Sequence, residues 1–258
     1  MNLSRRAALR AGAGLMVGAG LAGCVEQRVT RRTTVVDTSV SWPLTPNTGD
    51  ELDEDGFDEY VEEMQDHYGD SGVWGREAEH GDAFEVAYVQ RLAASRETPG
   101  DGGGSVSSLI PEEVQPDAPL LFVDACVAVY QVDDDRYRYW LWAAADSTDG
   151  RLIRDVDLAS LSTGVRFRGG ALADGAPASL VDDGVNVTLG GGPSATFPLS
   201  DGTVDMTRSL GVDGSYAVEW DGTVDGVQSV NGVCEEQRDD AYDLFWFVSA
   251  GYQFTEDV

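Results

Sequence analysis

Short apolar segments, separated by polar or glycine-containing turns, follow one another from Phe84 to the C-terminal end of the sequence. The two strongest strand predictions, Leu120–Val132 and Tyr137–Ala145, are joined by the polar run Asp133–Asp135, which predicts a β-hairpin. The other predicted strands are Phe84–Leu92, Val165–Arg168, Ala178–Val181, Val185–Leu189, Ala195–Leu199, Tyr216–Trp220 and Leu244–Phe254. Strands this short, recurring about every 8–12 residues, predict a mainly β protein, built as a β-sandwich or as barrel-like antiparallel sheets.

Two details of this pattern carry further expectations. Leu120–Val132 is apolar on both faces except at Asp124, which predicts a central strand that is covered on both sides. Asp182, Asp183 and Gly184 lie between two predicted strands, and we expect a hairpin turn there in which the glycine adopts a positive φ.

A helical pattern precedes the strands. Apolar residues recur at a spacing of three or four at Phe57, Tyr60, Val61, Met64 and Tyr68. This spacing predicts a helix with one apolar face, begun by Asp53 or Asp55 and ended by Gly69. The predicted fold class is therefore mainly β with one or two short N-terminal helices.

The first 24 residues have the pattern of an export signal. Arg5, Arg6 and Arg10 precede the short apolar segment Ala11–Leu21, which has about half the length that a membrane-spanning helix needs. Ser4–Arg10 resembles the twin-arginine export motif, and Leu21–Cys24 resembles a lipobox. That resemblance implies a twin-arginine-exported lipoprotein in which Cys24 is lipidated and the lipid anchors the protein to the membrane.

These observations divide the chain into three parts. Residues 1–23 are expected to be the signal peptide, 24–55 a lipidated flexible tether, and 56–258 a single β-rich extracytoplasmic domain. We expect Val35–Val36 to be the one place in the tether that could pair as an edge strand. The predicted location is the extracytoplasmic face of the cell membrane.

Acidic residues dominate the composition. The chain has 46 acidic and 17 basic residues and a formal net charge of −29, and every basic residue is an arginine. Such a balance excludes a nucleic-acid partner, because the surface cannot replace the counterions of phosphate groups. The composition resembles that of proteins from extremely halophilic archaea, in which high salt screens the repulsion between carboxylates. A GC-rich genome would also explain the absence of lysine.

Cys126 and Cys234 remain if Cys24 is lipidated. Outside the cytoplasm these two cysteines could form a disulfide, and the alternative is two buried free thiols. Asn186-Val187-Thr188 is an N-glycosylation sequon, but it lies within a predicted strand.

The sequence has no pattern that indicates catalytic, cofactor-binding or metal-binding residues. Gly69–Gly72 resembles the nucleophile segment of trypsin-like proteases, but the required distant histidine is missing, and the two histidines, His67 and His80, are too few for a zinc or copper site. Among the acidic turns, Asp133–Asp135 and Asp221–Asp225 are the best candidates for a weak calcium site. We therefore expect a non-enzymatic binding or envelope-interaction module with a protein or small-molecule partner. The alternative is an exported hydrolase with a carboxylate or serine site.

Overall fold

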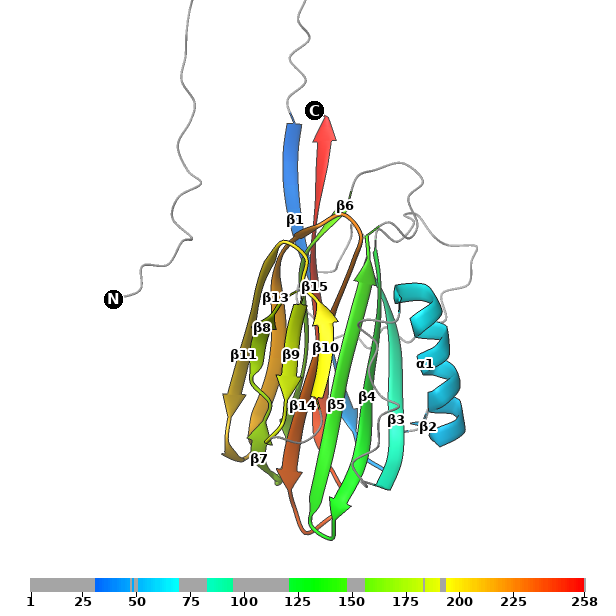
Figure 1. Cartoon of the computed structure of the whole chain (residues 1–258), viewed down its shortest axis with the longest axis vertical. Helices are drawn as coiled ribbons and strands as arrows, with labels where there is room; N and C mark the ends of the chain where they lie inside the picture. Colours follow the sequence, from blue (N-terminus) through cyan, green and yellow to red (C-terminus); the bar gives the residue numbers. More distant parts are fainter. Residues whose placement is uncertain are drawn as a thin grey trace, which may run out of the picture.

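The computed structural model describes residues 31–46, 48, 51–69, 83–94, 121–147, 156–182, 184–190 and 194–257 (Figure 1). Within these residues the chain forms fifteen β-strands and one α-helix. All the strand pairs among them are antiparallel. The prediction of a mainly β fold with antiparallel sheets and a short N-terminal helix is therefore confirmed.

The largest sheet has seven strands in the order β12-β7-β14-β5-β4-β3-β2. Their bounds are β2 Glu51–Leu52, β3 Ala83–Ala94, β4 Leu121–Asp133, β5 Arg136–Asp146, β7 Ala171–Gly175, β12 Gly211–Val212 and β14 Val227–Gln237. β4 and β5 form the predicted hairpin. β4 is buried along most of its length, as expected for a central strand with both faces covered.

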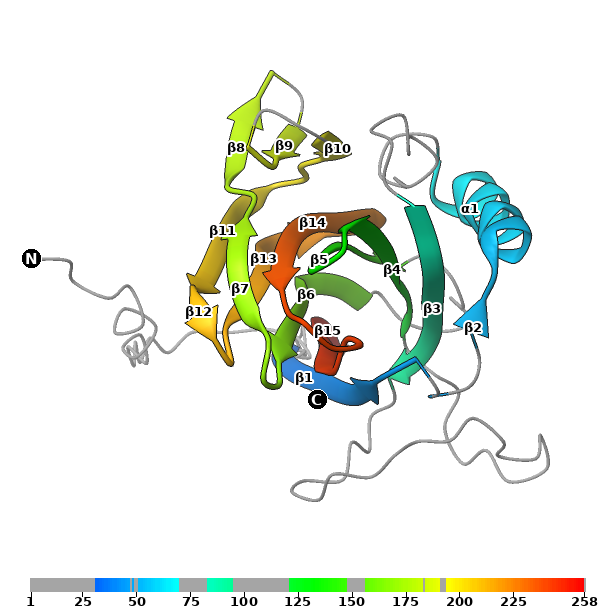
Figure 2. The ribbon, with the colours of Figure 1, turned by 90° about the horizontal axis from the view of Figure 1, so that it is seen from below.

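A second sheet has five strands in the order β1-β15-β6-β13-β11. Their bounds are β1 Arg31–Leu44, β6 Val156–Phe167, β11 Gly202–Ser209, β13 Ser215–Val224 and β15 Leu244–Asp257. Figure 2 shows the two large sheets curving around a common interior. Fully buried aromatic side chains fill this interior, among them Tyr139 from the first sheet and Tyr216, Trp220 and Trp246 from the second.

Three shorter strands form a separate sheet in the order β10-β9-β8. Their bounds are β8 Ala178–Val181, β9 Gly184–Thr188 and β10 Ser194–Pro198, and β9 and β10 contact β14. The hairpin between β8 and β9 is confirmed, but Gly184 is the first residue of β9 and pairs with Val181. A side chain there would meet the Phe197 carbonyl oxygen at 2.4 Å, so this position requires glycine because two backbones approach closely.

The flexible tether expected over residues 24–55 does not extend through residues 31–44. These residues form β1, which pairs with β15 along its whole length, from Arg31 opposite Asp257 to Leu44 opposite Leu244. Figure 1 shows β1 and β15 side by side, projecting beyond the rest of the sheet. The threonine- and serine-rich composition of this segment suggested a tether, but alternation of half-buried Val40 and Trp42 with exposed neighbours is the pattern of a strand.

The helix α1, Glu54–Tyr68, packs on the outer face of the seven-stranded sheet beside β3 and β2 (Figure 2). Asp53 begins it, since its side chain accepts a hydrogen bond from the Gly56 backbone N–H at 2.9 Å. Gly69 ends it with a φ of 87°, a conformation that favours glycine. The buried face carries Phe57, Val61, Met64 and Tyr68. Among the described residues no helix is both long and apolar enough to cross a membrane.

Candidate functional site

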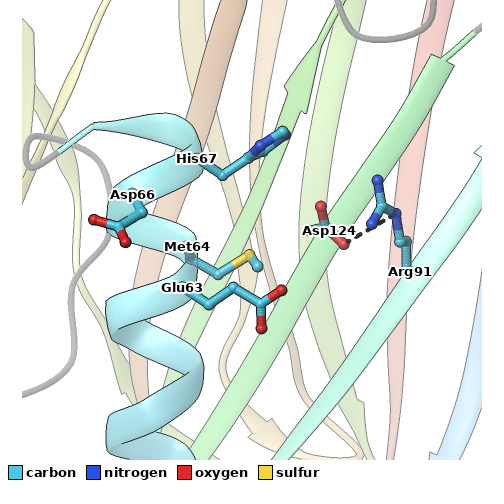
Figure 3. A pocket seen from close by; sticks show the side chains of 6 residues that line it. All are labelled: Glu63, Met64, Asp66, His67, Arg91 and Asp124. Atoms are coloured by element: carbon cyan, nitrogen blue, oxygen red, sulfur yellow. Dashed lines mark ion pairs between the residues drawn. The ribbon is translucent and has the colours of Figure 1, made fainter.

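A polar pocket lies between the second half of α1 and the strands β3 and β4. Its volume is about 270 Å³, and it is lined by Glu63, Met64, Asp66, His67, Arg91 and Asp124. Glu63 and His67 are four residues apart on α1 and therefore lie on the same face of the helix. Figure 3 shows both side chains extending toward Asp124 and Arg91, whereas Asp66 turns away from them.

Asp124 forms the floor of the pocket. It is the buried charged residue of the largely apolar strand β4, and only 5% of its surface is exposed. Tyr68 Oη donates a hydrogen bond to Asp124 Oδ2 at 2.7 Å. Arg91 lies directly opposite on β3, and its Nε is 3.7 Å from Asp124 Oδ1, which is an ion-pair contact longer than a hydrogen bond. One oxygen of this buried carboxylate is thus well satisfied and the other only loosely.

The wall beneath the pocket is aromatic. Trp142 contacts Tyr68 and Tyr60 edge-on, with ring centroids 5.6 Å and 6.3 Å apart. Burial first, and then the negative charge of Asp124, raise the pKa of Tyr68 well above its ordinary value, so Tyr68 stays protonated as the donor. The guanidinium of Arg91 lies 4.5 Å from the centre of the Phe122 ring, which holds the arginine beside Asp124.

The chemistry of the pocket follows from these side chains. Carboxylates outnumber the guanidinium, so the local potential is negative, as is the net charge of the chain. Within the described part of the chain, no three His, Cys, Asp or Glu side chains are grouped so that they could hold a metal ion. The arrangement can accept hydrogen bonds from a small ligand that enters between the helix and the sheet.

A second buried carboxylate, Glu236 at the end of β14, faces the interior between the two large sheets. It is fully buried and accepts hydrogen bonds from Tyr139 Oη at 2.5 Å and Arg238 Nη1 at 3.1 Å. Burial raises the pKa of Glu236 to about 7, against the lowering effect of Tyr139 and Arg238. This carboxylate is enclosed by the fold, so we assign it a structural role.

The predicted disulfide between Cys126 and Cys234 is wrong, and both are free thiols. β5 lies between β4 and β14 in the sheet, so the two cysteines are separated by an intervening strand. They also face opposite sides, because Cys126 pairs with Trp142 and Cys234 with Tyr139, and these two positions alternate along β5. No disulfide can span that separation.

Asn186 lies in β9, the middle strand of the small sheet, where it is half-buried. Its Nδ2 donates to Thr196 Oγ1 at 3.1 Å, and its Oδ1 accepts a hydrogen bond from Thr188 Oγ1. The sequon is therefore part of a paired strand. Its modification stays a prediction.

The two acidic segments that were candidates for a calcium site, Asp133–Asp135 and Asp221–Asp225, contain aspartates with other contacts. Asp133 Oδ2 accepts a hydrogen bond from Arg136 Nε at 2.8 Å. Asp221 lies in β13 opposite Thr203 of β11, so it belongs to a paired strand and not to a turn. Gly202 and Gly222 of these two strands face each other where two backbones approach too closely for side chains.

Several predicted residues lie outside the described part of the chain. They are Arg5, Arg6, Cys24, His80 and the protease-like residues Asp70–Gly72. Arg91 and Glu236 carried no signal in the sequence, because each lies within or beside a strand and gains its partner only through the fold. Asp124 was visible as the polar exception in an apolar strand.

Comparisons with known proteins do not identify a relative with a similar site. A scan against protein-family models finds no match, and neither the curated proteins nor the solved structures contain a significant match. The function must therefore be argued from the residues.

Proposed function

We propose that this chain is a lipid-anchored cell-surface protein whose β-rich domain is a non-enzymatic binding module, with its ligand site in the pocket between α1 and the seven-stranded sheet. The observation that carries the binding role is Asp124. It is a carboxylate buried beneath an open pocket, with one oxygen held by Tyr68 and the other loosely paired at 3.7 Å. Burying a charge is costly unless its hydrogen bonds are made, and a bound ligand would make the missing one.

The proposed lipid anchor at Cys24 lies close in sequence to the first strand of the fold, β1. Six residues separate Cys24 from Arg31, the first residue of β1. Even fully extended, such a connection reaches only about 20–25 Å. A lipidated Cys24 would hold the domain close to the membrane, with the β1–β15 end nearest to it.

The anchor is tested by Cys24→Ser in the native host. We expect the variant to be released into the medium, because the lipid is the proposed attachment. Arg5→Lys with Arg6→Lys is the matched control for export, and we expect that variant to remain inside the cell. If Cys24→Ser stays on the membrane as firmly as the wild type, the lipid anchor is wrong.

The binding role is tested by melting curves of the purified protein with three probes of equal chain length: n-butylamine, n-butyrate and n-butanol. We expect at least one probe to raise the Tm in a concentration-dependent way, because a ligand that binds only the native state stabilises it. Asp124→Asn should remove the effect. If none of the probes shifts the Tm, the pocket is not a binding site for small molecules.

A further inference from the structure

We infer that the pocket over Asp124 takes a small protonated amine, which donates an N–H to Asp124 Oδ1. The inference rests on the proposed binding function and specifies the ligand class. It comes from the hydrogen-bond inventory, the charges and the size of the site.

Asp124 keeps one carboxylate oxygen without a close donor. The side chain is more than nine-tenths buried, yet within the described part of the chain its Oδ1 has only the 3.7 Å contact with Arg91 Nε. Tyr68 is already committed to Oδ2. The pocket opens over this carboxylate (Figure 3), so a donor that enters the pocket can reach Oδ1. An ammonium group offers up to three N–H donors and a positive charge.

The charges around the pocket favour a cation. Glu63 extends from α1 toward Asp124, so two carboxylates face the space between helix and sheet (Figure 3). Arg91 stacks over Phe122 and faces Asp124, so its charge is partly compensated within the wall. An anionic ligand would meet Glu63 and Asp124 at close range, whereas a cation is attracted by both carboxylates and repelled only by Arg91.

The size of the pocket favours a small ligand. A pocket of about 270 Å³ is below the usual range for drug-sized ligands, about 300–1,000 Å³, so it suits a short amine rather than a peptide or a polymer. Met64 supplies an apolar contact for the carbon chain of such a ligand. A bare metal ion is a poorer fit, since the described residues provide no group of three ligands.

The test is isothermal titration calorimetry of the whole protein with n-butylamine, n-butanol and n-butyrate, at constant pH and in constant molar KCl. The salt suppresses non-specific attraction of amines to the acidic surface. We expect butylamine to bind and the other two probes to bind far more weakly. Asp124→Asn should weaken butylamine binding by roughly tenfold or more, because it removes a charge-assisted hydrogen bond.

Two further variants distinguish binding in the pocket from a general attraction of amines to the acidic surface. Glu63→Gln should weaken butylamine binding, because it removes the second carboxylate. Glu59→Gln is the matched control, since Glu59 is exposed and lies one turn earlier on α1, outside the pocket. The Glu59→Gln variant should bind butylamine with the same affinity as the wild type. Asn at position 124 can still accept the Tyr68 hydrogen bond, and circular dichroism checks that the fold is kept.

The outcomes distinguish the two proposals. Binding of butylamine that depends on Asp124 and not on Glu59 supports both. If butanol or butyrate binds in an Asp124-dependent way and butylamine does not, the amine inference is wrong and the binding role stands. If calcium chloride binds at Asp124 and butylamine does not, the site takes a metal ion and the amine inference is again wrong. If no probe binds, both proposals are overturned.

Discussion

At the scale of single residues, two buried carboxylates lie on opposite faces of the seven-stranded sheet. Asp124 faces α1 and the pocket, while Glu236 faces the interior beside Tyr139, whose ring contacts Phe167 of the other sheet. Glu236 is closed off by its neighbours, since a side chain at Gly170 would overlap it. One carboxylate is thus open to a ligand and the other is sealed in the core.

Glu236 should make stability depend on pH. Its pKa of about 7 in the fold lies above the ordinary 4.5, so the fold favours the protonated form. The stability that this preference contributes is fully present below pH 4.5 and is lost as the pH rises through about 7. The shift corresponds to roughly 3 kcal/mol. The Glu236→Gln variant cannot ionise at this position, so its stability should not decrease in this way as the pH rises.

Chemical denaturation at pH 4.5 and pH 8, in constant salt, measures this effect as the difference between the wild type and Glu236→Gln. The comparison cancels the titration of the many other carboxylates. We expect the variant to gain free energy of unfolding relative to the wild type when the pH is raised. An equal change in both proteins would show that Glu236 is not protonated in the fold.

At the scale of elements, the position of β5 between β4 and β14 keeps both core cysteines as free thiols. It separates Cys126 from Cys234 and turns them to opposite faces of the sheet. Burial raises the pKa of both thiols, which suppresses the reactive thiolate. We expect the Cys24→Ser protein to show no reaction with a thiol reagent while native, and two reactive thiols once unfolded without reductant. Unfolded protein without titratable thiols would mean that a disulfide had formed.

The elements that were predicted correctly are those whose signal is local. The β4–β5 hairpin follows from apolar runs around Asp133–Asp135, and α1 follows from its apolar stripe and its cap at Asp53. β14 was missed because buried polar residues interrupt it, among them Gln228, Asn231 and Glu236. Gln228 is buried because its Nε2 donates to the Pro198 carbonyl at 2.8 Å, and the sequence does not reveal that contact.

The candidate site shows the same limit. Asp124 and Tyr68 were each visible, one as a polar exception and the other as part of a helical stripe. Their hydrogen bond joins residues 56 positions apart, and it exists only because α1 lies across β4. The pairing of Arg91 with Asp124 depends on the register of β3 against β4. Neither placement follows from local propensity, so the pocket could not be predicted from the sequence and was found only in the structure.

At the scale of the whole molecule, the negative charge opposes folding. A net charge of −29 on the 258-residue chain produces mutual repulsion, and removal of residues 1–23 would take away three arginines and no acidic residue. Screening lengths fall from about 10 Å at 0.1 M salt to about 3 Å at 1 M. We therefore expect the Tm to rise steeply with KCl over this range, by about 2–4 °C for each kcal/mol of repulsion removed.

Melting curves in KCl and in sucrose of equal osmolality separate screening from general exclusion of the solute. Sucrose strengthens burial but does not screen charges. The increase should therefore be much larger in KCl, and most of it should occur at the lower salt concentrations, where the screening length changes most. Equal increases in both solutes, or a Tm independent of KCl, would show that repulsion between carboxylates does not limit the stability of this fold. In that case the acidic surface would need an explanation other than adaptation to high salt.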